Sequence, residues 1–236
     1  TFDIGPTFYW MPDVFEKFFN DFGKSVADYY KLEKLNPAYQ VYYGENDSIA
    51  IADDIQKIKQ TFEEHEKGSG KQLERFLKKA KSNYEIAIKD LVYKPGQSLF
   101  EIINTKTIFK LNEFFDNIKS QVARYIKNEK LRKILEFPVL FLGAKPSTTP
   151  SFYSFMNYAD LELGTWHPKG GMYSVVEAMT KLAKESGVKI INDSPVTEII
   201  IKNKMVSKVV TPSGEYNCDI LLSGADYHHT ESLIPK

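Results

Sequence analysis

Residues 164–226, which begin GTWHPKGGM and end DILLSGAD, decide the fold of this chain. The adjacent glycines Gly170 and Gly171 predict a turn where the backbone passes close to a flat or bulky group, because glycine has no Cβ. Apolar residues then recur at helical spacing from Met172, and Gly187 stands where a left-handed helix C-cap belongs. We therefore expect an amphipathic helix after the turn. Its apolar stripe comprises Met172, Val175, Val176, Met179, Leu182 and Ala183.

Short β-strands are predicted after this helix. Turn formers separate the apolar segments, namely Asn-Asp-Ser-Pro at 192–195 and the pair Asn203 and Lys204. The run Ile-Leu-Leu at 220–222 is unbroken, as in a strand buried on both faces, and the small residues of 223–226 follow it. Ligands of open α/β sheets lie beyond the carboxyl ends of such strands. The other predicted strands cover residues 188–191, 196–201, 205–210 and 215–218.

Three segments resemble one family. The sequence HPKGGMYSVVEAMTKLAKESGVKIINDSPVTEIII, together with SGADYHHT, closely resembles the phytoene desaturase and carotenoid desaturase family of flavoproteins. Residues 2–7 are similar to the family's FDxGPT, and residues 143–152 to its G-x-x-P…P-[AS]-[LF] segment. Gly224 stands where the family usually has Asn. The matches follow the family order and cover most of the chain.

The resemblance implies a fold and a domain plan. The family's strand–GxGxxG–helix unit, which binds a pyrophosphate at a helix N-terminus, does not occur in this sequence, and neither does the C-terminal flavin segment. We therefore expect an internal piece of a longer α/β flavoprotein. Residues 1–7 and 164–236 would belong to a discontinuous, Rossmann-like FAD-binding domain. Residues 8–163 would form an inserted, mainly helical substrate domain with a small antiparallel sheet, which makes the piece itself α+β.

The inserted region shows mostly helical patterns. Residues 38–43 and 48–52 flank Gly-Glu-Asn-Asp and predict a β-hairpin. Asp13, with Glu16 three residues later, predicts a capped helix to about residue 22. Residues 28–35 are expected to be helical or irregular. Further helices are expected from Asp53-Asp54 to Gly68, over 73–91, over 118–126 and over 131–135.

Several apolar and basic faces allow two interpretations. The phenylalanine stripe of the first helix either packs in the protein core or lines an opening that faces lipid. Residues 99–115 are packed against neighbouring helices, or they form an interfacial element or a wall of a substrate channel. The lysine face of the long helix is solvated or attracted to an anionic membrane. These faces consist of Phe15, Phe18, Phe19 and Phe22, and of Lys71, Lys78, Lys79 and Lys81.

Composition excludes several classes of protein. Thirty-one basic and 31 acidic residues leave no net charge to favour nucleic acid. A single cysteine, Cys218, rules out a disulfide framework and indicates a reducing, cytoplasmic compartment. The four histidines are not at zinc spacings with cysteine, so we expect no metal. No apolar run approaches the about 18 residues that span a bilayer, so membrane association would be peripheral.

The candidate catalytic residues are few. Glu101 has two apolar residues on each side, and burial there would raise the pKa of its carboxyl, as an acid or base at an apolar site requires. It also resembles an acidic position of the family. A surface glutamate on an amphipathic helix is the alternative. His167 precedes the glycine turn and either reaches the flavin or the substrate, or serves as a hydrogen-bonding scaffold.

The resemblance implies the cofactor contacts. The segment FDxGPT would lie beside the flavin ring, the double glycine would face the flavin, and the backbone of Val196 would contact the adenine. Ala225 and Asp226 would lie near the same cleft, and His228 and His229 either close over the cofactor or are ordinary exposed residues. The implied FAD-binding residues are Gly5, Pro6, Thr7, Gly170, Gly171, Met172, Val196, Ala225 and Asp226.

The leading functional hypothesis is an FAD-dependent carotenoid desaturase, or a related isomerase or saturase, acting on a carotenoid such as phytoene. FAD would accept a hydride, so the protein needs few catalytic side chains. One alternative is another flavin amine-oxidase-like oxidoreductase. The other is a lipid- or membrane-binding module without activity of its own. The exact substrate, the electron acceptor and the oligomeric state stay open.

Overall fold

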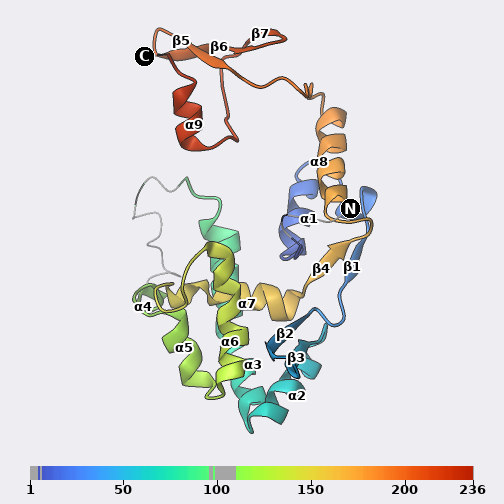
Figure 1. Ribbon diagram of the computed structural model, residues 1–236, viewed down its shortest axis with the longest axis vertical. Helices are drawn as coiled ribbons and strands as arrows, with labels where there is room; N and C mark the ends of the chain where they lie inside the picture. Colours follow the sequence, from blue (N-terminus) through green and yellow to red (C-terminus); the bar gives the residue numbers. More distant parts are fainter. Residues whose placement is uncertain (1–4, 6, 96–97, 99–109, 236) are drawn as a thin grey trace. The chain divides into compact units, whose positions relative to one another are not determined.

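The computed structural model describes residue 5, residues 7–95, residue 98 and residues 110–235. The chain divides into two compact units, residues 1–179 and residues 180–236, which we call unit one and unit two (Figure 1). Both contain helices and small antiparallel sheets. In the described part of the chain, no helix has the length and apolar character needed to cross a bilayer.

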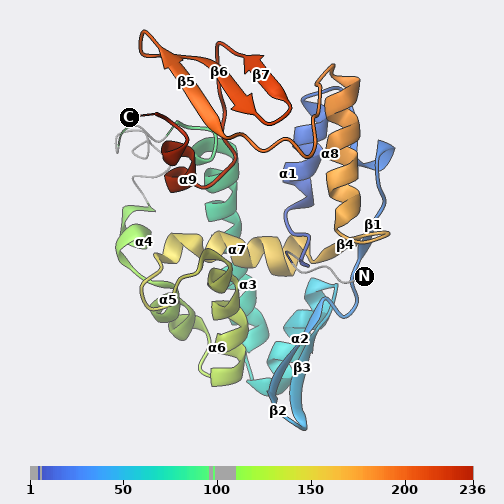
Figure 2. The same cartoon turned by 45° about the horizontal axis from the view of Figure 1, so that its top comes forward.

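The core of unit one is formed by helices packed on a hairpin. The predicted hairpin is confirmed as β2 (Tyr39–Gly44) and β3 (Asp47–Ile51), which pair antiparallel with Tyr39 opposite Ile51. It lies beside α2 (Ile55–His65) in both Figure 1 and Figure 2. Asp54 caps α2 by accepting hydrogen bonds from the amides of Gln56 and Lys57. The buried core residues include Ile49, Ile51, Ile58, Phe62, Leu73, Phe76, Leu77, Ile118, Val122, Leu131, Ile134 and Leu135.

The remaining helices of the insert follow the predicted periodicity. The long predicted helix is α3 (Ser69–Ile86), which continues into a π-helical turn (Ala87–Leu91) before Pro95. The stripes predicted after residue 118 are α5 (Ile118–Tyr125) and α6 (Glu129–Glu136). Unit one also contains several shorter elements. They are α4 (Leu111–Phe115), a 3-10 segment (Phe137–Leu142), a 3-10 turn (Ser151–Ser154), α7 (Phe155–Tyr158) and a second π-helical turn (Ala159–Leu163).

The first helix differs from its prediction. Helix α1 (Pro12–Asn20) begins with Pro12 in its first turn and Met11, at φ 56°, as its cap residue, so the predicted Asp13 cap is wrong. Proline favours the first helical position because its φ is already helical, and this moves Asp13 inside the helix. The Asp13 carboxylate instead accepts a hydrogen bond from the Tyr84 hydroxyl at 2.8 Å. Of the phenylalanine stripe, Phe19 is fully buried, whereas Phe18 and Phe22 are exposed.

A small sheet links distant parts of unit one. Residues 28–35 were expected to be helical or irregular, but they contain β1 (Leu32–Lys34), which follows a short 3-10 turn (Val26–Asp28). Strand β1 pairs antiparallel with β4 (Trp166–Pro168). The pairing partner is more than a hundred residues away, so local sequence could not reveal this strand.

The lysine face of the long helix α3 is only partly solvated, because Lys79 forms an ion pair with the buried Glu113.

Helix α8 (Tyr173–Glu185) confirms the predicted helix after the glycine turn, and it contains the boundary between the two units. Gly187 has a φ of 83°, as expected of its predicted capping role. The predicted apolar stripe is partly wrong. Val175 and Leu182 of the stripe are buried, but Val176 and Met179 are exposed.

Unit two contains the end of α8, a three-stranded antiparallel sheet and a short helix. The sheet has the order β5 (Glu198–Lys202), β6 (Met205–Thr211), β7 (Gly214–Asn217), which confirms three of the predicted strands. Asn203 and Lys204 both have positive φ, which suits the tight turn between β5 and β6. The end of helix α9 (Tyr227–Ser232) is tied to the sheet, because the amide of Ile199 donates to the carbonyl of Leu233.

Two predicted strands of unit two are wrong. Residues 188–191 and 220–222 belong to no strand in the structure. Ile220 and Leu222 are 88% and 95% exposed, whereas the prediction required a strand buried on both faces. A β-strand needs a neighbour to satisfy its amides and carbonyls, and the described residues supply none for these two runs.

Candidate functional site

The glycine turn of unit one has the backbone that its sequence predicts. Gly170 and Gly171 have φ values of 97° and 99°, in the left-handed region that glycine adopts without strain. The turn is held by the amide of Gly171, which donates to the carbonyl of Pro168, and by the amide of Lys169, which donates to the carbonyl of Lys31. A Cβ added at Gly170 would meet no atom within 4 Å. The turn is therefore open on one side, where a flat group can approach it.

The start of the described chain lies beside the segment that precedes this turn. Tyr9 and Trp166 pair through two backbone hydrogen bonds of 3.2 and 3.1 Å. The Trp10 indole donates to the Thr165 hydroxyl at 2.8 Å. Thr7, two residues before this bridge, is exposed. The residues that follow the first of the resembling segments therefore lie beside the residue that precedes the segment beginning at His167.

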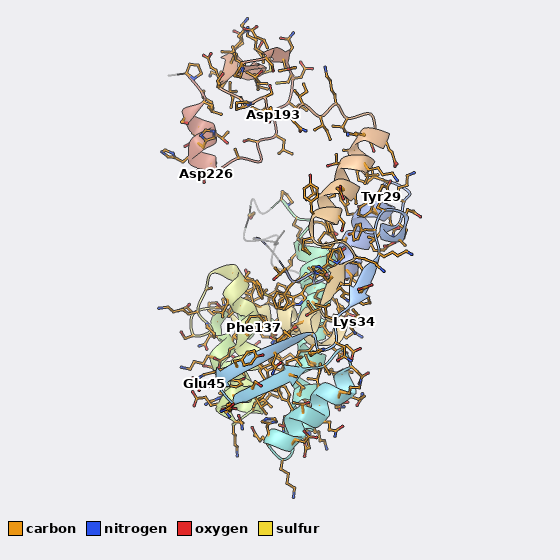
Figure 3. All side chains as sticks on the ribbon, turned by 45° about the vertical axis from the view of Figure 1, so that its right-hand side comes forward. Tyr29, Lys34, Glu45, Phe137, Asp193 and Asp226 are labelled. Atoms are coloured by element: carbon orange, nitrogen blue, oxygen red, sulfur yellow. The ribbon has the colours of Figure 1, made fainter. Side chains whose placement is uncertain are left out.

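An aromatic cluster occupies the same region of unit one. It consists of Phe8, Trp10, Tyr39, Phe137 and Phe141, and Figure 3 labels Phe137. The ring of Phe8 lies 5.7 to 6.1 Å from each of the other four. Trp10 and Phe141 are 4.9 Å apart. The cluster continues to the surface, because Phe141 is 51% exposed. Sequence reasoning did not find it, although the phenylalanines at 137 and 141 have helical spacing.

Leu140 and Leu142 flank Phe141 and are also exposed, at 59% and 45%. All three belong to the 3-10 segment that begins with Phe137, and Gly143 ends it at φ 65°. Exposed apolar patches of this kind mark surfaces that bind ligands, proteins or membranes. The cluster therefore has an apolar edge in contact with solvent.

Beneath the cluster lies a buried carboxyl that sequence reasoning also missed. Asp160 is 2% exposed and lies in the π-helical turn Ala159–Leu163. Its Oδ2 accepts a hydrogen bond of 2.7 Å from the Tyr39 hydroxyl. Burial raises the pKa of Asp160 to about 7, although the Tyr39 hydrogen bond opposes the shift. The available signal was an acidic residue within the largely apolar sequence FMNYADLEL.

The predicted catalytic residues have different outcomes. Glu101 lies outside the described residues, and so does Pro6. His167 is half-buried in β4, where it pairs with Glu33 across the small sheet. A role for either residue in the reaction stays a prediction.

Unit two contains a separate hollow of about 370 Å³. It brings together two of the predicted cofactor residues, Val196 and Ala225, and His229 lies on its wall. Asp226, labelled in Figure 3, caps α9 by accepting a hydrogen bond from the amide of His229 at 3.2 Å. His228 is exposed. The full lining is Pro195, Val196, Ile199, Leu221, Leu222, Ser223, Gly224, Ala225, His229 and Leu233.

Comparison with known proteins places the chain in a family. The family model described as flavin containing amine oxidoreductase matches residues 48–235. The chain belongs to the flavin-containing amine oxidoreductase family. Among curated relatives, a carotenoid 3,4-desaturase of Haloarcula japonica is 35% identical over 99% of this chain and 48% of its own length. A zeta-carotene-forming phytoene desaturase of Myxococcus xanthus is 28% identical over 100% of this chain and 47% of its own.

These relatives confirm the resemblance to carotenoid desaturases. A 4,4'-diapophytoene desaturase of Staphylococcus haemolyticus is 32% identical over 86% of this chain and 41% of its own length. The chain therefore spans about half the length of the curated relatives it matches.

Solved structures show a shared fold. An oxidoreductase from Methanosarcina mazei has a TM-score of 0.50 at 14% identity, over 87% of this chain and 42% of its own. RAB GDI from Plasmodium falciparum has a TM-score of 0.52 at 11% identity, over 91% of this chain and 48% of its own. Proteins with very different names share this fold, so the fold alone does not decide the activity.

Membership of the family implies FAD. The described residues fit such a group in each unit considered by itself. In unit one, the space that a Cβ at residue 170 would occupy is free of other atoms, so a flat group can approach the Gly170 backbone there. In unit two, the hollow lined by Val196 and Ala225 has the size of a small-ligand pocket.

Proposed function

We propose that this protein is an FAD-dependent oxidoreductase that introduces or rearranges C=C double bonds in a carotenoid such as phytoene. The observation that carries the proposal is the match to a carotenoid 3,4-desaturase over 99% of the chain at 35% identity. The aromatic cluster of unit one supports it, because a long polyene needs an extended apolar surface. The protein would be cytoplasmic.

We propose the following division of the chain. Residues 1–7 and 164–236 belong to the FAD-binding domain, and residues 8–163 form the substrate domain. Tyr9, near the start of the proposed substrate domain, pairs with Trp166 of the proposed FAD-binding domain, which supports a division in which both domain boundaries are close in space.

The cofactor contacts are proposed residue by residue. Gly5, Pro6 and Thr7 would lie at the flavin ring, together with the turn Gly170-Gly171-Met172. The backbone of Val196 would contact the adenine, and Ala225 and Asp226 would lie near the same cleft. The openness at Gly170 supports the first assignment, and the hollow in unit two supports the second.

The chemistry that FAD supplies is hydride acceptance from the carbon chain of the substrate. The residues of this chain have to bind a long apolar molecule, orient it and keep water away from it. The rings of Phe8, Trp10 and Phe137 provide such a surface, and the exposed Phe141 lies at its edge. Glu101 is the proposed acid–base residue, and His167 would reach the flavin or the substrate.

We also propose that the protein meets a membrane surface peripherally. Carotenoids are too apolar to be free in water, so the substrate has to be collected from lipid. The exposed residues Leu140, Phe141 and Leu142 support this step, because they adjoin the aromatic cluster and can insert into the interface.

The test uses the full-length protein with FAD, liposomes and a panel of acyclic and cyclic carotenes. We expect yellow protein with a flavin absorbance band, and products whose absorbance shows altered conjugation after chromatography. A colourless protein that cannot be reconstituted with FAD would refute the proposal in favour of a lipid-binding protein. A flavoprotein that oxidises amines and leaves every carotene unchanged would instead support another flavin amine oxidase.

A further inference from the structure

The buried carboxyl of Asp160 is only half satisfied. Its Oδ2 accepts the Tyr39 hydrogen bond, but its Oδ1, which is also buried, has no hydrogen-bond partner among the described residues. A buried polar atom without a partner costs about 1–3 kcal/mol. Native structures contain few such atoms, and each one calls for an explanation. Packing alone would be served better by an apolar residue at this position.

The backbone around Asp160 is unusual as well. It belongs to a π-helical turn, Ala159–Leu163, and turns of this kind occur frequently at functional sites. The end of the same turn contacts the segment beside the candidate flavin turn. The Trp166 indole donates to the carbonyl of Leu163 at 2.9 Å, and Trp10 bonds to Thr165. Asp160 is therefore part of the framework that supports the aromatic cluster.

Tyr39 connects this carboxyl to the cluster. It projects from β2, and its ring lies 5.9 Å from Phe8 and 5.6 Å from Phe137. The hydrogen bond to Asp160 fixes the far end of the ring. Without this anchor, the ring would be held by apolar contacts alone, which restrict its orientation less.

We propose that Asp160 is a positioning residue for carotene binding, because its carboxyl holds the Tyr39 ring in the orientation against which a polyene packs. The inference rests on the proposed function. Asp160 does not contact the ligand itself and acts through Tyr39. The pair would therefore set how tightly, and in which orientation, the cluster binds a long apolar molecule.

The test measures carotene binding to the full-length protein by induced circular dichroism. An achiral acyclic carotene shows no such signal in free solution and acquires one in a chiral protein environment. We expect Tyr39→Phe and Asp160→Leu each to weaken the affinity about two- to tenfold, the range expected for one hydrogen bond. The double variant should lose no more than either single one, because both changes break the same bond. Asp160→Asn, whose amide oxygen still accepts from Tyr39, should bind within about twofold of the wild type.

The matched control is Tyr84→Phe. Tyr84 also donates to a carboxylate, that of Asp13, at 2.8 Å, but it is not a member of the aromatic cluster. This variant should lose stability as Tyr39→Phe does and keep the wild-type affinity. If Asp160→Leu does not fold, the carotene affinity of Tyr39→Phe, compared with that of Tyr84→Phe, still tests the positioning role.

The outcomes separate this inference from the proposed function. A wild-type protein that gives no induced signal with any carotene would refute both. A wild-type protein that binds carotene, with equal affinity in Tyr39→Phe and Asp160→Leu, would refute the positioning role alone. Losses that add up in the double variant would also refute it, since the two residues would then act separately.

Discussion

Replacing Asp160 by Asn should change how the stability of the protein depends on pH. In the folded protein, burial raises the pKa of this carboxyl from 3.8 to about 7. Between these values the folded state keeps a proton that the unfolded state has lost, so the free energy of unfolding falls as the pH rises. At about 1.4 kcal/mol per pH unit, the loss amounts to about 4 kcal/mol between pH values of about 4 and 8. Asn does not titrate and avoids this loss.

The assay is urea unfolding of the full-length wild type and of Asp160→Asn at several pH values in this window. The relevant quantity is the difference between the two free energies of unfolding, because other titrating groups contribute equally to both proteins. We expect the difference to move in favour of Asn by about 4 kcal/mol from the acidic to the alkaline end. A difference that stays constant within about 1 kcal/mol would refute a raised pKa at Asp160. In Tyr39→Phe, which lacks the bond that opposes the shift, the pKa of Asp160 should rise further.

Three further predictions concern the turn, a helix cap and the cluster. Gly170→Ala should destabilise the protein by about 1 kcal/mol, because its φ is 97°, and should lower the flavin content measured by absorbance. Gly143→Ala, at φ 65° and away from the turn, should show a similar stability loss with normal flavin. Asp54→Ala should reduce thermal stability by about 1 kcal/mol through loss of the α2 cap, and no loss would contradict the capping bonds. Phe141→Ala should change the unfolding midpoint little, because the side chain is half exposed, and should weaken carotene binding; unchanged binding would remove Phe141 from the site.

Local sequence was sufficient where short-range forces decide the structure. The hairpin β2–β3 follows from two alternating segments around a polar turn, and α2 begins at its Asp54 cap. Likewise, Gly187 ends the predicted helix with the expected positive φ. In each case the deciding contacts lie within a few residues, so the pattern alone predicts them.

Local sequence failed where the deciding partner is distant or belongs to no described segment. Strand β1 exists because β4 pairs with it. The apolar run 220–222 was predicted to be a buried strand for its composition, yet it pairs with no described segment. The apolar composition of a segment indicates that it tends to be buried. A β-strand also needs a second segment at hydrogen-bonding distance, and composition does not show whether one is there.

The sequence by itself determined the family, the glycine turn and the helical character of the insert, because motifs and periodicity are local properties. Only the tertiary structure decided which residues meet. It brought Phe8 and Trp10 to Phe137 and Phe141, and it placed the Asp160 carboxyl on the Tyr39 hydroxyl 121 residues away along the chain. The physical reason is that a ring contact or a buried hydrogen bond requires two groups to be close in space. Once the chain has folded back on itself, the number of residues between two groups does not give the distance between them.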